Sequence, residues 1–190
     1  PWHQAGSGGF LRNVVYGFND GLTANFGLVA GVIGASVGPH VVLVSGMAGM
    51  IADALSMGSS GYLAAKSELE VYAHEIAMES EEIRLMPEVE EDELALLYEA
   101  KGIEREEARR RAHEVIGDPE RALAEKVREE LKIGDQRSTP LREGLVTGTA
   151  TAIGALIPVA PFLFMSGTPA IASSFTISML SHFAVGGARS

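Results

Sequence analysis

Charged residues are almost absent from two long blocks of this chain and are concentrated in the segment between them. Between residues 21 and 65 the only formally charged residue is Asp53, and between residues 144 and 188 there is none. A helix that crosses a bilayer needs roughly 20 mostly apolar residues, and a soluble protein of this size rarely uses two such blocks. The distribution of charge therefore predicts an all-α membrane protein.

Each apolar block is too long for a single span and has turn residues near its middle. The breaks are Ser-Val-Gly-Pro-His at 36–40 and Ser-Gly-Thr-Pro at 166–169. Glycine and proline favour turns, and a proline after a turn can begin the next helix. We therefore expect two helical hairpins, with a kink in the third span at Pro158 and Pro161. The four expected spans cover about 20–36, 41–65, 144–165 and 170–188.

The chain thus divides into three predicted parts. Residues 1–65 hold an N-terminal segment and the first two spans, residues 66–142 form an acidic helical domain, and residues 143–190 hold the third and fourth spans. The two hairpin turns carry no Lys or Arg, whereas the acidic domain carries many, so the positive-inside rule places this domain in the cytosol. The net charge of −10 argues against a nucleic-acid partner.

Glycine and proline also divide the acidic domain into helices. The second span contains no breaker between Gly61 and Met86, so it should continue beyond the membrane as one long helix until Pro87. Glycine after a last turn and proline at the next start then predict three shorter helices. These cover about 89–101, 104–116 and 119–133.

Glycines recur at four-residue spacing along the first span. The pairs are Gly17/Gly21, Gly27/Gly31 and Gly34/Gly38. This spacing lets two helices approach closely. Two interpretations remain open, namely packing within the helix bundle and contact between two copies of the chain in a homodimer.

Two acidic residues fall within the first two spans, where an acid is costly and indicates function. Asp20 lies 18 residues before Gly38 and Met57 lies 19 residues after it, so both lie at a similar depth. Asp53 lies one helical turn deeper than Met57. A carboxylate with a thioether could pass Fe²⁺. The alternatives are that the methionines fill gaps between helices and that Asp53 is hydrogen-bonded to another span.

The acidic domain concentrates carboxylates around Pro87. Residues 68–93 contain eleven acids and one formally charged base, Arg84. Glu79 and Glu82 share a face before the proline, and Glu90 and Glu93 share one after it, so a turn at Pro87 brings the pairs together. Carboxylates forced together repel one another unless a cation or protons neutralise them. The pattern predicts a site for a divalent cation, with a solvated acidic face as the alternative.

Two stretches of the chain carry a family resemblance. One is Tyr-Gly-Phe-Asn-Asp-Gly-Leu-Thr at 16–23, and the other, longer and more specific, is Ala-Leu-Ser-Met-Gly-Ser-Ser-Gly-Tyr-Leu-Ala-Ala-Lys-Ser-Glu at 54–68. They resemble the vacuolar iron transporter family, in particular its bacterial branch with a ferritin-like domain ahead of the membrane part. The resemblance runs from Asn13 to Arg189.

The resemblance implies a proton-coupled antiporter that exports Fe²⁺, and often Mn²⁺, from the cytosol. It implies a homodimer with five spans per subunit in a bacterial inner membrane, and no prosthetic group. The transport path falls on Asp20 and Met57. The cytosolic metal ligands are five glutamates, namely Glu79, Glu82, Glu90, Glu93 and Glu130.

Three departures from the family pattern stand out. Lys126 and Val127 replace paired methionines of the plant members, which weakens the soft-ligand part of the cytosolic site. A membrane glutamate of those members falls on Gly49, and Asp53, one turn on, could take its place. Only four spans are visible, so we expect a fifth beyond Ser190 and regard the chain as a fragment.

Three hypotheses follow, none of them an enzyme. The first is a metal transporter, the second is a membrane-anchored metal sensor or store, and the third is a structural membrane protein with a non-specific acidic face. Asp20 and Asp53 favour the transporter, because a mere anchor has no use for buried acids.

Overall fold

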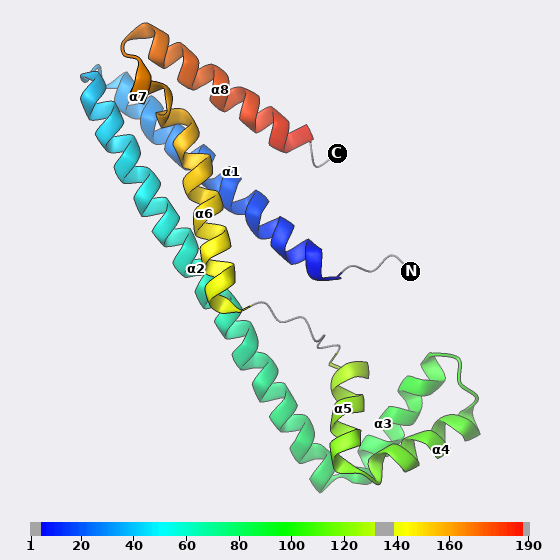
Figure 1. Ribbon diagram of the computed structural model, residues 1–190. Coiled ribbons are helices and arrows are strands. Elements are labelled where there is room, and N and C mark those ends of the chain that lie inside the picture. The colour runs from blue at the N-terminus through cyan, green and yellow to red at the C-terminus, as the bar shows by residue number, and fades with distance from the viewer. Residues whose placement is uncertain (1–4, 132–138, 188–190) are drawn as a thin grey trace. The chain divides into compact units, whose positions relative to one another are not determined.

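The computed structural model describes residues 5–131 and 139–187, with side chains from residue 10 onward, and these residues form helices and no strand. The chain separates into two compact units, which are described in turn. The first unit comprises Pro1–Lys66 and Ser138–Ser190, and the second comprises Ser67–Arg137. Figure 1 shows the order of the helices along the chain.

The first unit is built from five helical segments. These are α1 (Ala5–Gly34), the first part of α2 (Pro39–Leu85), α6 (Pro140–Val159), α7 (Pro161–Phe164) and α8 (Thr168–Gly187). The two expected breaks are confirmed, since Ser36 and Gly167 adopt positive φ angles of 57° and 68°. The expected kink of the third span is also confirmed, because α6 ends at Val159 and the chain resumes as α7 at Pro161.

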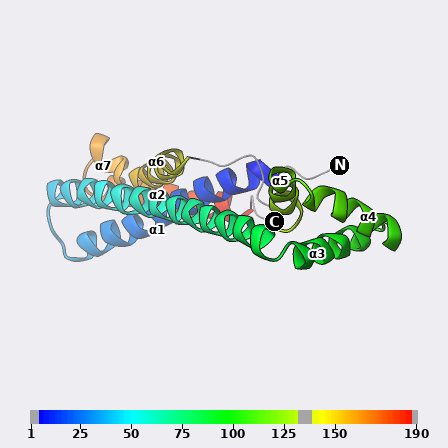
Figure 2. The ribbon, with the colours of Figure 1, turned by 90° about the horizontal axis from the view of Figure 1, so that it is seen from below.

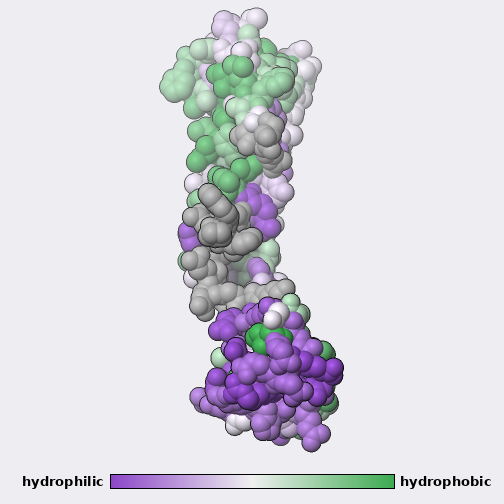
Figure 3. Space-filling view, turned by 90° about the vertical axis from the view of Figure 1, so that its right-hand side faces the viewer, coloured by the Kyte–Doolittle hydropathy of each residue, from purple (hydrophilic) through white to green (hydrophobic). Residues whose placement is uncertain are grey.

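Two described helices, α2 and α8, are long and apolar enough to cross a membrane. The other two expected spans carry more polar residues. Helix α6 includes Arg142 and Glu143 in its first turn, and α1 carries Asn19, Asp20 and Asn25 among its glycines. The space-filling view shows hydrophobic residues gathered on the visible face of the first unit and hydrophilic residues on that of the second (Figure 3).

Glycine lets α6 pack closely against α1 and α2. A Cβ atom at Gly21 would collide with the carbonyl oxygen of Thr151, and one at Gly154 would collide with that of Phe18. A Cβ atom at Gly148 would lie 2.8 Å from the carbonyl oxygen of Ala54 on α2. Figures 1 and 2 show α6 running beside both helices. No side chain larger than hydrogen fits at these positions.

The remaining glycines of α1 lie in a different environment. Beyond the local helix backbone, no described atom lies within 4 Å of a Cβ built at Gly27, Gly31 or Gly34. The six glycines of the repeat therefore do not share one role. Gly17 and Gly21 pack within the unit, and the later glycines leave an open face.

The second unit consists of the last part of α2 followed by α3 (Pro87–Ala100), α4 (Arg105–Ile116) and α5 (Pro119–Glu129). The sequence predicted these helices, and their ends are confirmed to within a few residues. Glu104 and Asp118 cap α4 and α5, because each carboxylate accepts hydrogen bonds from two backbone N–H groups of the first turn. The part of the predicted last helix beyond residue 131 lies outside the described residues.

A small apolar core holds these helices together. Ile83 of α2 packs with Leu94 and Tyr98 of α3, and alanines of α4 and α5 fill the space between them. The alanines allow the helices to approach closely. As a result, polar side chains at the end of α2 and on α3 and α5 can reach a common centre.

Candidate metal site

Five carboxylates that the sequence singled out come from three helices of the second unit. Glu79 and Glu82 lie one turn apart near the end of α2, Glu90 and Glu93 lie one turn apart on α3, and Glu130 caps the end of α5. Pro87 at the first position of α3 ends the long helix and sets the reversal between the two pairs. We call this set the glutamate cluster.

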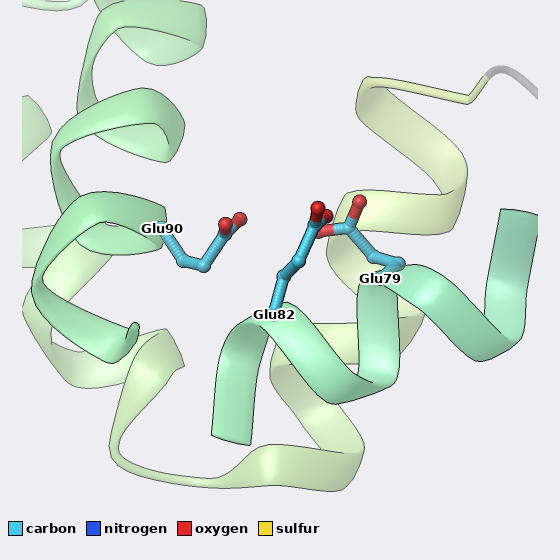
Figure 4. Close-up of side chains that lie close together, drawn as sticks. All are labelled: Glu79, Glu82 and Glu90. Carbon is cyan, nitrogen blue, oxygen red and sulfur yellow. The ribbon is translucent and has the colours of Figure 1, made fainter. Parts of the chain in front are cut away.

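Three members of the cluster approach closely enough to share one ion. Carboxylate oxygens of Glu79, Glu82 and Glu90 all lie within 4.8 Å of one another. Figure 4 shows the Glu90 side chain extending from α3 toward those of Glu79 and Glu82 on α2. Glu79 and Glu90 are only 4% and 3% exposed, so these two carboxylates are not part of a solvated surface.

A lysine occupies the centre of the cluster. The side chain of Lys126, on α5, is fully buried, and its Nζ lies 3.3 Å from Glu79 Oε1, 2.7 Å from Glu90 Oε2 and 3.1 Å from Glu93 Oε2. It also forms an ion pair with Glu130, one turn further along α5. One ammonium thus contacts four of the five carboxylates.

The cluster carries more negative charge than this ammonium can balance. Burial alone would lower the pKa of Lys126, but its contacts with the surrounding carboxylates raise it above the ordinary value, so the side chain stays charged. Burial raises the pKa of Glu79 to about 7, against the opposing effect of Lys126. The cluster therefore retains a partly protonated carboxyl group as well as a buried cation.

Two buried oxygens in the cluster have no well-aligned hydrogen-bond donor among the described residues. Glu79 Oε1 and Glu90 Oε2 lie within ion-pair distance of the ammonium, but no described group is aligned to donate to them. An ammonium has three protons, and here four carboxylates surround it. Hard divalent cations are bound by several carboxylate oxygens, which is the donor set found here.

Lys126 is the residue whose role the sequence analysis missed. It was noted only as a departure from the methionines of the plant members. A usable signal was present, because Lys126 precedes Glu130 by four residues and residues at this spacing share a helix face. A lysine on the face of α5 that carries a predicted ligand should have been expected among the other ligands.

The predicted transport residues lie on α1 and α2 of the first unit. Asp20 is exposed, whereas Asp53 and Met57 are half-buried. The transport path through these three residues stays a prediction.

Asn25 is a second residue that sequence reasoning did not identify. It is fully buried on α1, and its Nδ2 donates hydrogen bonds of 3.0 Å to the carbonyl oxygen of Gly46 on α2 and 2.7 Å to that of Ala155 on α6. Its Oδ1 has no hydrogen-bond partner among the described residues. A Cβ at Gly49 would lie 2.6 Å from this oxygen, so the glycine makes room for it.

The fold and the cluster together define a class of protein. It is an all-helical chain with apolar helices of membrane-spanning length and, in a separate unit, a carboxylate cluster suited to cations. The model of the VIT family matches residues 11–190. The chain belongs to this family.

Curated relatives agree with this assignment. Vacuolar iron transporter 1 of Arabidopsis thaliana is 35% identical, over 96% of this chain and 74% of the relative. Vacuolar iron transporter 1 of Oryza sativa subsp. japonica is 37% identical, over 87% of this chain and 66% of the relative. The vacuolar iron transporter of Toxoplasma gondii is 32% identical, over 85% of this chain and 54% of the relative.

Proposed function

We propose that this chain transports a divalent metal across a membrane, exporting Fe²⁺, and also Mn²⁺, from the cytosol in exchange for protons. The observation that carries the proposal is the convergence of Glu79, Glu82 and Glu90 in a member of the VIT family. The names of these relatives, which are vacuolar iron transporters, support iron as the cargo.

The two units have different tasks in this proposal. The glutamate cluster collects the cation on the cytosolic side, because hard and borderline divalent ions favour carboxylate oxygens. Asp20, Asp53 and Met57 on α1 and α2 then form the path through the membrane. A carboxylate can bind Fe²⁺ when ionised and take up a proton when the metal leaves, which is a simple means of coupling the two fluxes.

The four-span arrangement, a fifth span and the homodimer belong to the same proposal. The open face at Gly27, Gly31 and Gly34 supports the dimer, since four-residue glycine spacing suits close contact between helices. The resemblance to the bacterial branch supports a place in a bacterial inner membrane. It also supports a ferritin-like domain ahead of the membrane part in the full protein.

Flux of Fe²⁺ into proteoliposomes tests the proposal. Asp20→Asn should abolish metal flux while leaving folding and dimerisation unchanged, because an amide can neither neutralise the cation nor carry the proton. Met57→Leu should reduce flux less, and should affect Fe²⁺ more than Mn²⁺, because a thioether matters less to the harder ion. Asp92→Asn makes the same chemical change at an exposed position of α3 and should transport normally.

Transport by Asp20→Asn at the wild-type rate would make Asp20 a structural acid and shift the proposed path to Asp53. Wild-type protein that binds metal but shows no flux under any proton gradient would instead favour the anchored sensor or store.

A further inference from the structure

The ammonium group of Lys126 occupies the centre of the glutamate cluster. Its ammonium lies 2.7–3.3 Å from carboxylate oxygens of Glu79, Glu90 and Glu93, which come from two helices other than its own. A divalent ion bound by the same oxygens would require the space that the ammonium fills. The cluster cannot hold both cations at its centre.

We infer that the Lys126 ammonium is a built-in competitor of the metal, and that a divalent cation binds the glutamate cluster only by displacing it. The inference rests on the proposed function, because it describes how the site that collects the metal is regulated. The lysine lowers the affinity of the site, so the cluster fills only when the cytosolic metal concentration is high.

The cluster has one closed side and one open side. The side chains of Glu79 and Glu90 are 5% and 4% exposed, whereas those of Glu130 and Glu93 are 37% and 50% exposed. The open side gives a metal ion a way in. It also gives the ammonium a way out, since the flexible lysine stem can turn so that its charged end enters water.

Hydrogen-bond capacity favours the exchange. The ammonium has three protons for four surrounding carboxylates, so it cannot donate a separate hydrogen bond to each of them. A metal ion has no such directional limit and can be coordinated by Glu79 Oε1 and Glu90 Oε2 together with Glu82. It also brings two positive charges where the lysine brings one, so it neutralises more of the charge of the cluster.

Binding of Mn²⁺ to the full chain in detergent, followed by calorimetry, tests the inference. Lys126→Met removes the ammonium and keeps a flexible side chain of similar length. Its Mn²⁺ affinity should exceed that of the wild type by about 30-fold, the effect of one unit charge on a divalent ion about 4 Å away even when screened as in water.

Lys101→Met is the matched control. Lys101 pairs with Glu129 outside the glutamate cluster, so this change removes one positive charge from the same unit without opening the cluster. The Mn²⁺ affinity of Lys101→Met should stay within about twofold of the wild type, because exposed charges are strongly screened.

Equal Mn²⁺ affinities for Lys126→Met and Lys101→Met would overturn the inference and leave the proposed function standing. Absence of binding in both variants and in the wild type would overturn the inference together with the metal-binding part of the proposed function.

A second measurement covers the case in which Lys126→Met leaves the cluster unstable without metal. Hydrogen exchange of the α3–α5 peptides should then be fast in the metal-free variant and should return to wild-type protection when Mn²⁺ is added. Exchange that stays fast at saturating Mn²⁺ would mean that Lys126 is structural, and would overturn the inference.

Discussion

The two units of this protein treat buried polar groups differently. In the first unit the most deeply buried polar side chains are neutral, and Asn25, Thr151 and Ser174 each donate to a backbone carbonyl. The buried acid of this unit, Glu143, is 8% exposed and accepts a hydrogen bond from Asn13. In the second unit the buried polar side chains are charged, namely Glu79, Glu90 and Lys126. The first unit pairs most of its buried polar atoms internally, as a bilayer demands, although Asn25 Oδ1 and Ser178 Oγ have no partner among the described residues. The second concentrates charge that a cation has to balance.

Close glycine contacts between helices hold the first unit together. Substituting one of these glycines should give the largest loss of stability among the variants considered. Gly21→Leu should destabilise the first unit by about 3 kcal/mol or more, because any side chain there meets the backbone of Thr151 on α6, which cannot rotate away. Thermal unfolding of the full chain in detergent measures the loss. Wild-type stability would show that α1 and α6 are not in close contact.

Gly27→Leu is the control on the same helix. Nothing described lies within 4 Å of a Cβ at this position, so the variant should keep wild-type stability. If the open face is the dimer contact, the variant should also elute as a monomer in size-exclusion chromatography. A dimer that persists would place the contact between copies elsewhere.

The charged cluster of the second unit should respond to pH. Burial raises the pKa of Glu79 from an ordinary value of 4.5 to about 7, so the folded state binds this proton more tightly than the unfolded state. The resulting stabilisation is complete below pH 4.5 and is lost as the pH rises through about 7. Without metal, hydrogen exchange of α3–α5 should therefore become faster between pH 5 and pH 8, after correction for the intrinsic rate.

Glu79→Gln sharpens this prediction because glutamine is neutral at every pH. Hydrogen exchange of α3–α5 in the variant should depend less on pH than in the wild type between pH 5 and pH 8. Added Mn²⁺ should also protect the wild type more than the variant at pH 8, since a metal ligand has been removed. Identical pH profiles for the two proteins would place the titrating group elsewhere in the cluster.

Much of this arrangement could be read from the sequence, for physical reasons that are visible in particular residues. Proline and glycine act locally, so Pro39, Pro87, Pro119 and Pro140 mark the first residues of four helices. The turn at Pro87 likewise sufficed to bring the glutamate pairs of α2 and α3 together.

What the sequence did not reveal depends on contacts between helices distant in the chain. The four-residue spacing of Lys126 and Glu130 shows that they share a helix face, but how far Lys126 reaches into the cluster depends on how α5 packs against α2 and α3. The glycine repeat looks uniform along α1, yet only its first part meets α6. The four-residue spacing predicts close approach but does not say which partner approaches.

Substitution of Asn25 should change stability least among these predictions, because the side chain makes one stabilising and one destabilising contribution. Asn25→Leu removes the hydrogen bonds to Gly46 and Ala155, which join α1 to α2 and α6. It also removes a buried Oδ1 that has no partner among the described residues, and leaving such an oxygen unpaired costs free energy. A net loss of about 1 kcal/mol remains, the usual scale for hydrogen bonds between membrane helices. The thermal midpoint in detergent should fall by about 2–4 °C.

Thr151→Val is the matched control, since the hydroxyl of Thr151 donates to Thr147 within its own helix and its loss should leave the midpoint nearly unchanged. Equal midpoints for the two variants would mean that glycine packing alone holds the three helices together.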